Sequence, residues 1–488
     1  MSEILFHYKR PDPATWVYLS SFLTIGLFFV FHRFWSIRNL DILLLLLLAP
    51  GLLMVHDGRR AEFQASEAKA AAEVLLPTTD EAGAAIDFAD PDADQVPAEL
   101  SGPLRQRRDA IEAVEDARGL QLRGFIWLLG IQILILLRLL LDAAMVRRPL
   151  LAPNLTTGGL FFIGVSLLIF LMANVITSTA RQQLEQGPEL SRAGYPLMQA
   201  LPALPTRTES YGHLTPAAAN EPATAEATPP RAGAVIARIL VIAAHIAVLV
   251  GIVLIGYRHF GNLRAGAGCA LLYLMLPYTA QMTGRVDHVM PAAMLVWAVL
   301  MYRRPLIAGI FLGLAAGLVY YPLFLLPLWI SFYWQRGLKR FNIGVLVTIG
   351  VLMLCLSLGG SEELGTRLRQ MFGLWLPRSE NLQGVWGLGW FAIWRLPVLV
   401  AFLLLAGFYS VWPAQKNLGT LISCSAALMV AAQFWHGYGG GLYIAWFLPL
   451  LLLTIFRPNL EDRVALKVIG GSSLPSGRRA PDSQTEAA

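Results

Sequence analysis

The segment GRVDH, which contains Arg285, Asp287 and His288, holds the residue types best suited to chemistry in this sequence. A carboxylate beside an imidazole and a guanidinium can bind a hydroxyl, a phosphate or a divalent cation. Asp287 and His288 supply at most two metal ligands, so a divalent cation is one option and no cofactor is assigned. The alternative is a loop whose polar residues simply meet water.

A second group of polar and aromatic residues lies between residues 359 and 388. It mixes arginines with tryptophans, at Arg367, Arg369, Arg378, Trp375, Trp386 and Trp390. Arginine pairs bidentately with phosphate, and aromatic faces stack on sugar rings. An aromatic belt at the membrane interface with snorkelling arginines fits the same pattern. Further along, His436 opens the segment HGYGGG. Its glycines predict a flexible turn, which would line the same outer site as the residues between 359 and 388.

Composition places the chain in a membrane. Of its 488 residues, 56% are hydrophobic and 14% are charged, with a mean hydropathy of +0.56. Apolar runs typical of membrane spans recur about thirteen times, some of them shorter than the roughly 18 residues usually needed. They cover residues 16–31, 41–55, 123–146, 157–176, 234–256, 265–283, 287–301, 305–319, 321–334, 341–358, 389–411, 417–434 and 441–456. Backbone amides must be satisfied locally in lipid, which predicts an all-α, polytopic integral membrane protein.

Short loops give the orientation through their lysines and arginines. Alternating the spans puts the basic loops on one side, at Arg33, Arg38, Arg147, Arg148, Arg258, Arg264, Arg303, Arg304, Arg336, Lys339 and Arg340. This pattern predicts a multi-pass protein of the inner (plasma) membrane with its N-terminus outside and its C-terminus in the cytoplasm. The net charge of +6 mostly reflects these loops and does not indicate nucleic-acid binding.

Three parts are expected along the chain. Residues 1–40 form an extra N-terminal transmembrane helix that stays as a signal anchor, residues 41–456 form the main membrane domain, and residues 457–488 form a disordered cytoplasmic tail. Composition predicts that residues 61–100, acidic, and 201–231, rich in Pro, Ala and Thr, are disordered outer segments. Residues 104–122 fit either a helix lying on the membrane surface or a solvated helix leading into the next span.

Two pairs of charges fall within or beside the apolar runs. Arg138 and Asp142 stand four residues apart, so they can pair on one helical face. Charges inside a membrane are costly and often functional, but this pair lies toward the predicted cytoplasmic end, away from the polar outer segments. We interpret it as structural, and Arg38 with Asp41 in the same way.

The order of parts from Met282 to Arg340 is distinctive. Asp287-His288 opens an apolar helix, an Arg-Arg-Pro turn follows, and the small-residue helix LIAGIFLGLAAGLV breaks at Tyr320-Tyr321-Pro322 before a second apolar segment that ends in RGLKR. Small residues allow close helix packing. This order resembles the multi-spanning glycosyltransferases of the GT-C superfamily, which take a sugar from a lipid-phosphate carrier at the outer membrane face.

The resemblance implies a GT-C-like core over residues 41–456 and a site at the outer face. It implies that Asp57, in VHDGRRAE, is the catalytic base, since an aspartate after an outward-running span has this role in the family. The alternative for Asp57 is a polar residue that ends a helix at the interface. Asp287 is the second expected catalytic residue.

The same resemblance implies a set of substrate-binding residues. The segment ENLQGVWGL resembles the outer loop of one mannosyltransferase branch. The residues expected to bind substrate are Arg285, His288, Tyr320, Tyr321, Arg378, Asn381, Gln383 and His436.

The resemblance thus implies transfer of a sugar from a polyprenyl-phosphate donor to an acceptor at the extracytoplasmic face. The expected partners are the lipid-linked sugar and membrane lipids, while the sugar, the acceptor and the oligomeric state stay open. One alternative is a transporter or flippase, which predicts inverted repeats and ionisable residues near the midplane. Another is a non-catalytic GT-C-like protein of envelope assembly, favoured because Val319 stands where relatives often carry a basic residue.

The orientation is testable by cysteine labelling. In inner-membrane vesicles of native orientation, an impermeant thiol reagent should label Ala93→Cys and Ala223→Cys from the outer side, but not Gln415→Cys. Labelling of Gln415→Cys alone would invert the predicted topology.

Overall fold

The structure is a computed structural model that describes residues 11–74, 98–142, 145, 151–178, 195–201, 232–358, 364–373, 382–414 and 416–458. Its regular structure is helical, apart from one isolated bridge between Gln383 and Tyr438. The α-helices are α2 (Pro13–Phe28), α3 (Ile37–Leu46), α4 (Leu48–Val74), α5 (Ala98–Asp142), α6 (Thr157–Thr177), α8 (Pro196–Ala200), α9 (Ala232–Arg258), α10 (Leu263–Met275), α11 (Pro277–Gln281), α12 (Val286–Leu300), α13 (Pro305–Leu318), α14 (Leu326–Tyr333), α15 (Leu338–Leu358), α16 (Leu364–Phe372), α17 (Arg395–Val411), α18 (Leu418–Trp435) and α19 (Leu448–Phe456).

Within the described residues, seven helices are long and apolar enough to cross a membrane. They are Ile37–Val74, Gly102–Asp142, Thr157–Thr177, Val235–Arg258, Leu338–Ser357, Ala392–Val411 and Leu418–Trp435. Shorter apolar helices cover Pro13–Phe28, Leu263–Met275, Val286–Leu300, Pro305–Leu318 and Tyr321–Tyr333. The prediction of an all-helical membrane protein is confirmed, whereas the count of about thirteen spans stays a prediction.

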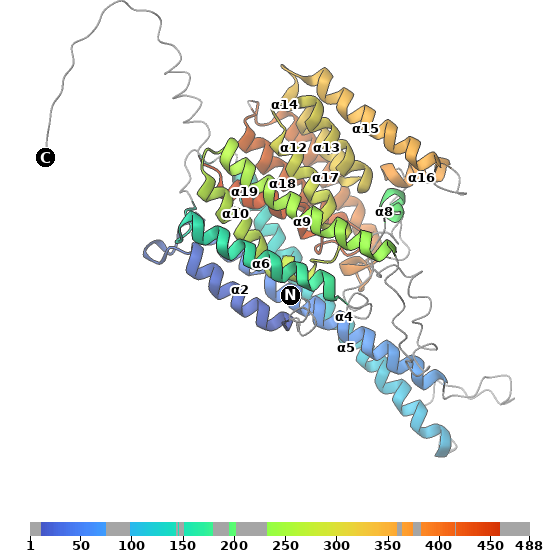
Figure 1. Ribbon diagram of the computed structural model, residues 1–488. Helices are drawn as coiled ribbons and strands as arrows, with labels where there is room; N and C mark the ends of the chain where they lie inside the picture. Colours follow the sequence, from blue (N-terminus) through green and yellow to red (C-terminus); the bar gives the residue numbers. More distant parts are fainter. Residues whose placement is uncertain are drawn as a thin grey trace, which may run out of the picture.

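Helix α18 lies at the centre of the bundle, with 94% of its apolar window buried. Around it pack α5, α14, α17 and α19. At the edges, α6, α15 and α17 expose apolar side chains, and only 22–33% of their apolar windows are buried. Figure 1 shows α15 along one edge of the body and α2 with α6 along another. Such apolar outer faces fit a surface in contact with lipid, because lipid tails do not penalise exposed Leu, Ile or Phe.

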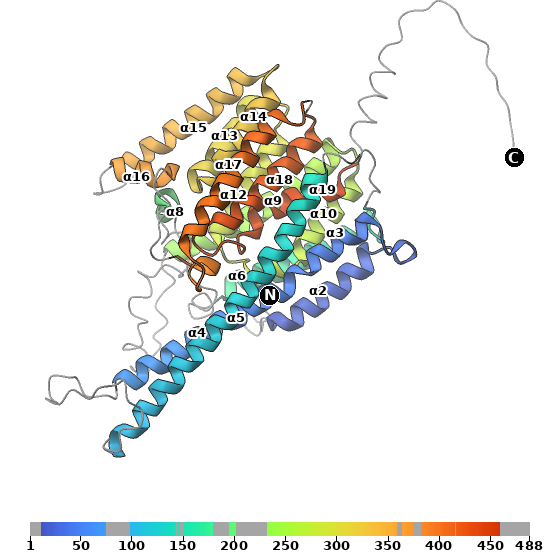
Figure 2. The same cartoon turned by 180° about the vertical axis from the view of Figure 1, so that it is seen from behind.

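Helices α4 and α5 form an antiparallel hairpin that extends beyond the rest of the body (Figures 1 and 2). Ala65 and Ala72 on α4, and Ala110 and Ala117 on α5, are buried along it. Both pairs are seven residues apart, the repeat that keeps one seam of a helix against its partner. At Gly58 an added Cβ would lie 2.6 Å from the Gln121 side chain, so glycine permits this close approach.

The hairpin changes the expected boundary of the acidic segment. Residues 61–74 are helical and continue α4, although composition over 61–100 predicted disorder. The composition average hides the alanine seam, which buries one face of a segment that is otherwise charged. Residues 104–122 belong to the same helix as the following span and pack on α4, which favours the interpretation as a helix leading into the membrane. Residues 75–97 and 202–231 lie outside the described residues.

A buried network of four charges ties three parts of the chain together at the other end of α5. Arg138 donates to Asp41 on α3 at 2.7 and 3.0 Å, and to Asp142 at 3.1 Å. Arg457, just after α19, donates to the second oxygen of Asp142 at 2.6 Å. All four residues are at most 9% exposed. The expected structural pair therefore exists and is extended by a residue 315 positions away in sequence.

Loops predicted to share the cytoplasmic side contact one another at this same end. Arg38 donates to the Ala152 carbonyl at 2.6 Å, Arg264 to Pro153 at 2.8 Å and Asn154 to Gly26 at 3.2 Å. Asp41 accepts from Arg138, and Arg38 donates to the Phe28 and Ala152 carbonyls. The pairing of Arg38 with Asp41 stays a prediction. Together these contacts close one end of the bundle.

We expect Arg138→Leu to lower the free energy of unfolding by about 3–5 kcal/mol, because two buried carboxylates would lose a partner. The control is Arg108→Leu, since Arg108 pairs with Glu112 at 3.2 Å with both side chains more than 60% exposed. Such a surface pair contributes about 1 kcal/mol or less. Unfolding in detergent micelles measures both variants, and equal midpoints for the two would contradict a structural role of the network.

Candidate functional site

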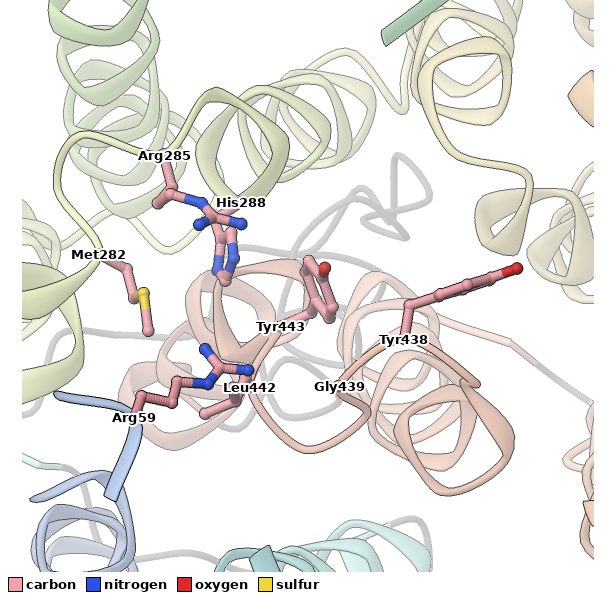
Figure 3. Close-up of a pocket in the computed structure, with 8 residues that line it drawn as sticks. All are labelled: Arg59, Met282, Arg285, His288, Tyr438, Gly439, Leu442 and Tyr443. Atoms are coloured by element: carbon pink, nitrogen blue, oxygen red, sulfur yellow. The ribbon is translucent and has the colours of Figure 1, made fainter. Parts of the chain in front are cut away.

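At the opposite end of the bundle, beside the hairpin, lies a small hollow that opens to solvent. It is bounded by α4, the start of α12 and the turn after α18, and its lining residues are Arg59, Met282, Arg285, His288, Tyr438, Gly439, Leu442 and Tyr443. Figure 3 shows Arg59 and His288 directed toward one another across it, with Arg285 beside His288, while the Tyr438 ring points away. All of these segments are predicted to be extracytoplasmic.

Arg285 and Asp287 form a buried two-bond ion pair at the start of α12. Arg285 Nε donates to Asp287 Oδ1 and Nη2 to Oδ2, both at 3.1 Å, and both residues are at most 3% exposed. Asp287 also sits in the first turn of the helix, where the helix dipole favours a negative charge. Trp446 Nε1 donates to its backbone oxygen at 3.1 Å. Asp287 thereby holds the Arg285 guanidinium at the edge of the hollow.

His288 is fixed on three sides. Its Nδ1 is hydrogen-bonded to the Tyr278 hydroxyl, its Nε2 lies 3.9 Å from Asp287 Oδ2, and its ring stacks on Tyr443 with centroids 4.5 Å apart. It is 3% exposed. A carboxylate behind an imidazole that lines a hollow can stabilise a proton taken up by that imidazole.

Arg59 was not among the residues expected from the sequence. It stands three residues after His56 on α4, so the two share one face of the helix, and its guanidinium lies 6.0 Å from the centre of the Phe125 ring. It lines the hollow opposite Arg285. Asp57, the expected base, is exposed on α4 and lines neither this hollow nor its neighbour, although His56 and Arg59 do.

A second, more apolar hollow of about 260 Å³ adjoins the first along α4. Its lining residues are Leu52, Val55, His56, Arg59, Gln281, Met282 and Leu442. Arg59, Met282 and Leu442 line both hollows. Val55 and Leu52 lie about one and two turns along α4 from Arg59, on the part of the helix that enters the membrane body. A charged space thus continues into an apolar one.

The turn from His436 to Tyr443 is held firmly, in contrast to the flexible turn that its glycines predicted. Gln433 Oε1 accepts from the backbone N–H groups of Gly441 and Tyr443 at 3.2 Å, and Gln132 Nε2 donates to the Gly441 carbonyl at 2.6 Å. Gly439 and Gly441 have positive φ, a conformation that glycine adopts at little cost. The glycines allow the backbone to turn tightly inside the protein, and this turn places Tyr443 on the wall of the hollow.

Behind Tyr443 a column of aromatic rings continues away from the hollow. Tyr443 lies 4.7 Å from His436, His436 lies 4.9 Å from Tyr321, and Tyr321 stacks on Tyr320 at 4.3 Å, all between ring centroids. The structure therefore brings Tyr320, Tyr321, His436 and His288 into one cluster. Their ring faces cover one another, so Tyr320 and Tyr321 form a wall of the site and present little surface for stacking on a sugar.

The remaining expected residues contribute less. The Gln383 backbone N–H donates to the Gly437 carbonyl at 2.9 Å, which attaches its segment to the turn. Arg378 and Asn381 lie outside the described residues. Among the described residues there is no group of three or more His, Cys, Asp or Glu side chains that could hold a metal ion, and a divalent cation stays a hypothesis.

No protein-family model, curated protein or solved structure matches this chain.

The two expected carboxylates should differ sharply on neutralisation. Asp287→Asn leaves Arg285 buried without its charge partner, so we expect a loss of about 3–5 kcal/mol in the free energy of unfolding. Asp57→Asn changes an exposed side chain and should stay within about 0.5 kcal/mol of the unmodified protein. Unfolding in detergent compares them, and a larger loss for Asp57→Asn would show that this site is wrongly assigned.

Proposed function

We propose that this membrane protein binds a phosphate-bearing lipid carrier in the two adjoining hollows and transfers the carried sugar to an acceptor at the extracytoplasmic face. The observation that carries the proposal is the pair of guanidiniums, Arg59 and Arg285, on one hollow that continues into an apolar one. The phosphate is bound by the arginines, and the first part of the lipid chain lies along Leu52 and Val55. This activity is the one implied by the resemblance to the GT-C glycosyltransferases.

Charge favours a phosphate in the first hollow. Arg59 and Arg285 both line it, and the Asp287 carboxylate is bonded to Arg285. Glu62, one turn along α4 from Arg59, is bonded to Arg118 and Gln121 outside the hollow. A sugar phosphodiester carries one negative charge, and the phosphate monoester left after transfer carries about 1.5–2 at neutral pH. Guanidiniums held in place before reaction stabilise such a developing charge without reorganisation. The site is therefore better matched to the departing phosphate than to the intact donor.

In the proposed reaction the acceptor oxygen bonds to the anomeric carbon while the bond from that carbon to the phosphate oxygen breaks. The acceptor hydroxyl must also lose its proton. Asp287 and His288 are the acid–base pair beside the hollow, so we assign the proton to this pair. Asp57 is not assigned a role, because it is exposed on another face of α4.

A second candidate is a protein that binds the carrier without transferring the sugar. It is favoured by one observation: both carboxylate oxygens of Asp287 already accept hydrogen bonds from Arg285. A carboxylate engaged in this way is a weaker base. The two candidates share the binding site and differ only in turnover.

We expect Arg59→Gln to weaken binding of polyprenyl phosphate by roughly 10–100-fold, because a hydrogen bond between charged groups contributes about 1.5–3 kcal/mol. Arg60→Gln is the matched control, since Arg60 is the next residue, is exposed and lines neither hollow. Binding to purified protein in detergent is measured with a labelled carrier. Equal affinities for the two variants would overturn the phosphate site.

Turnover separates the two candidates. Purified protein is incubated with polyprenyl-phosphate-linked mannose, glucose or arabinose and a membrane extract as the source of acceptors. Release of polyprenyl phosphate that depends on the extract supports the transferase. Carrier binding without release of phosphate from any donor supports the binding protein.

A further inference from the structure

Two buried hydrogen-bond donors beside Tyr321 have no partner among the described residues. They are the indole N–H of Trp435, the last residue of α18, and the Nε2 atom of His436, which follows it. Trp435 is 6% exposed and His436 is fully buried. The centroids of their rings lie 5.0 and 4.9 Å from the centroid of the Tyr321 ring, so both donors belong to residues that contact Tyr321.

The protonation of His436 follows from its other nitrogen. The backbone N–H of Tyr438 donates to His436 Nδ1 at 3.0 Å, so Nδ1 carries no proton. Burial, together with the charge of Arg395, lowers the pKa of His436 to about 3, and the ring is neutral at physiological pH. A neutral imidazole with an unprotonated Nδ1 carries its hydrogen on Nε2. His436 Nε2 is therefore a donor.

Several other polar groups around these two donors are paired, although Gln132 Oε1 beside the same turn also lacks a partner among the described residues. Trp446 donates to the Asp287 backbone oxygen at 3.1 Å, Trp386 to the Phe434 carbonyl at 3.1 Å, and Gln433 accepts from two backbone amides. Native proteins pair nearly all buried polar groups, and a donor left without a partner costs free energy. The Trp435 and His436 donors belong to adjacent residues next to the proposed substrate site. This position indicates that a ligand supplies their hydrogen-bond acceptor.

We propose that the Trp435 indole N–H and His436 Nε2–H bind an oxygen atom of a sugar acceptor. This inference rests on the proposed function, because it places the second substrate beside the carrier site. His436 and His288 both contact Tyr443, at 4.7 and 4.5 Å between ring centroids, so the acceptor subsite and the acid–base pair share one ring as a wall.

The chemistry of these two N–H donors favours an oxygen atom of the acceptor substrate over the phosphate of the carrier. Neutral N–H groups suit a neutral hydroxyl or ring oxygen, whereas phosphate is matched by the guanidiniums of the first hollow. The charge nearest to this subsite, Arg395, donates from Nε and Nη2 to the Trp435 carbonyl, both at 3.2 Å. It thereby positions the end of α18 and the two donors.

The first test compares two buried tryptophans. Both changes shrink a buried ring and therefore share a packing cost. Trp446→Phe also removes a donor that has a partner, so its unfolding midpoint should fall by about 1–2 °C more than that of Trp435→Phe. Trp435→Phe should weaken binding of alkyl glycosides by roughly 2–10-fold. A fall in stability as large as that of Trp446→Phe would assign Trp435 to a structural bond and overturn the proposal.

The second test separates the two nitrogens of His436. Asparagine places an acceptor near the Nδ1 position and keeps the bond from Tyr438, but lacks the Nε2 donor. Glutamine places an amide donor near the Nε2 position. We expect octyl mannoside or octyl glucoside to bind His436→Gln more tightly than His436→Asn. The reverse order, or equal weakening by both, would show that only the turn geometry matters and would overturn the role of Nε2.

The third test observes the indole directly. In protein labelled with ¹⁵N-tryptophan, the Trp435 N–H resonance is assigned by its loss in Trp435→Phe. Octyl mannoside or octyl glucoside should move it downfield, as expected for a new hydrogen bond. A shift with polyprenyl phosphate alone would assign the donor to the carrier, and no shift with any probe would exclude a ligand role; both overturn the proposal. Carrier binding by Arg59 and Arg285, measured on the same samples, shows separately whether the proposed function holds.

Discussion

The pairing of Arg138 with Asp41 and Asp142 is the constraint on which the rest of the bundle depends. Charges buried among apolar helices must be compensated locally, and here two arginines face two carboxylates within one network. The network joins α3, α5 and the residue after α19, so it fixes the position of α5 along its axis. Because α4 packs on α5, that position also sets where Arg59 lies toward the other end.

The two ends of the bundle use charge differently. At the closed end, four charges balance and every carboxylate has an arginine. At the site end, Arg59 and Arg285 line one hollow, and the Asp287 carboxylate is bound by Arg285, a residue only two positions away in sequence. A local pair of this kind orients its arginine without linking distant elements. The closed end therefore holds the fold, while the site end keeps a positive wall that a phosphate can complete.

Sequence alone predicted what depends on local pattern. Apolar runs located the helices, and the spacing of Arg138 and Asp142 predicted their pair, because a helix places residues four apart on one face. The sequence could not identify Arg457 as a further partner of Asp142, because the two residues are 315 positions apart. In VHDGRRAE the family resemblance drew attention to Asp57. The face of α4 that lines the hollow is decided by packing on α5, and this face carries Arg59. The glycines of HGYGGG predicted mobility, but their purpose became visible only with Gln433 bonded to the turn.

The double role of Arg285 connects carrier binding to acid–base chemistry in the proposed reaction. Its guanidinium has five N–H donors, and the pair with Asp287 uses two of them. A phosphate that binds in the hollow competes with Asp287 for the same positive charge, which raises the proton affinity of the carboxylate and of the neighbouring His288. In the proposed reaction the bound carrier therefore makes proton uptake by this pair less costly. A transferase built in this way would need no separate base in the first outer loop, which is consistent with the exposed position of Asp57.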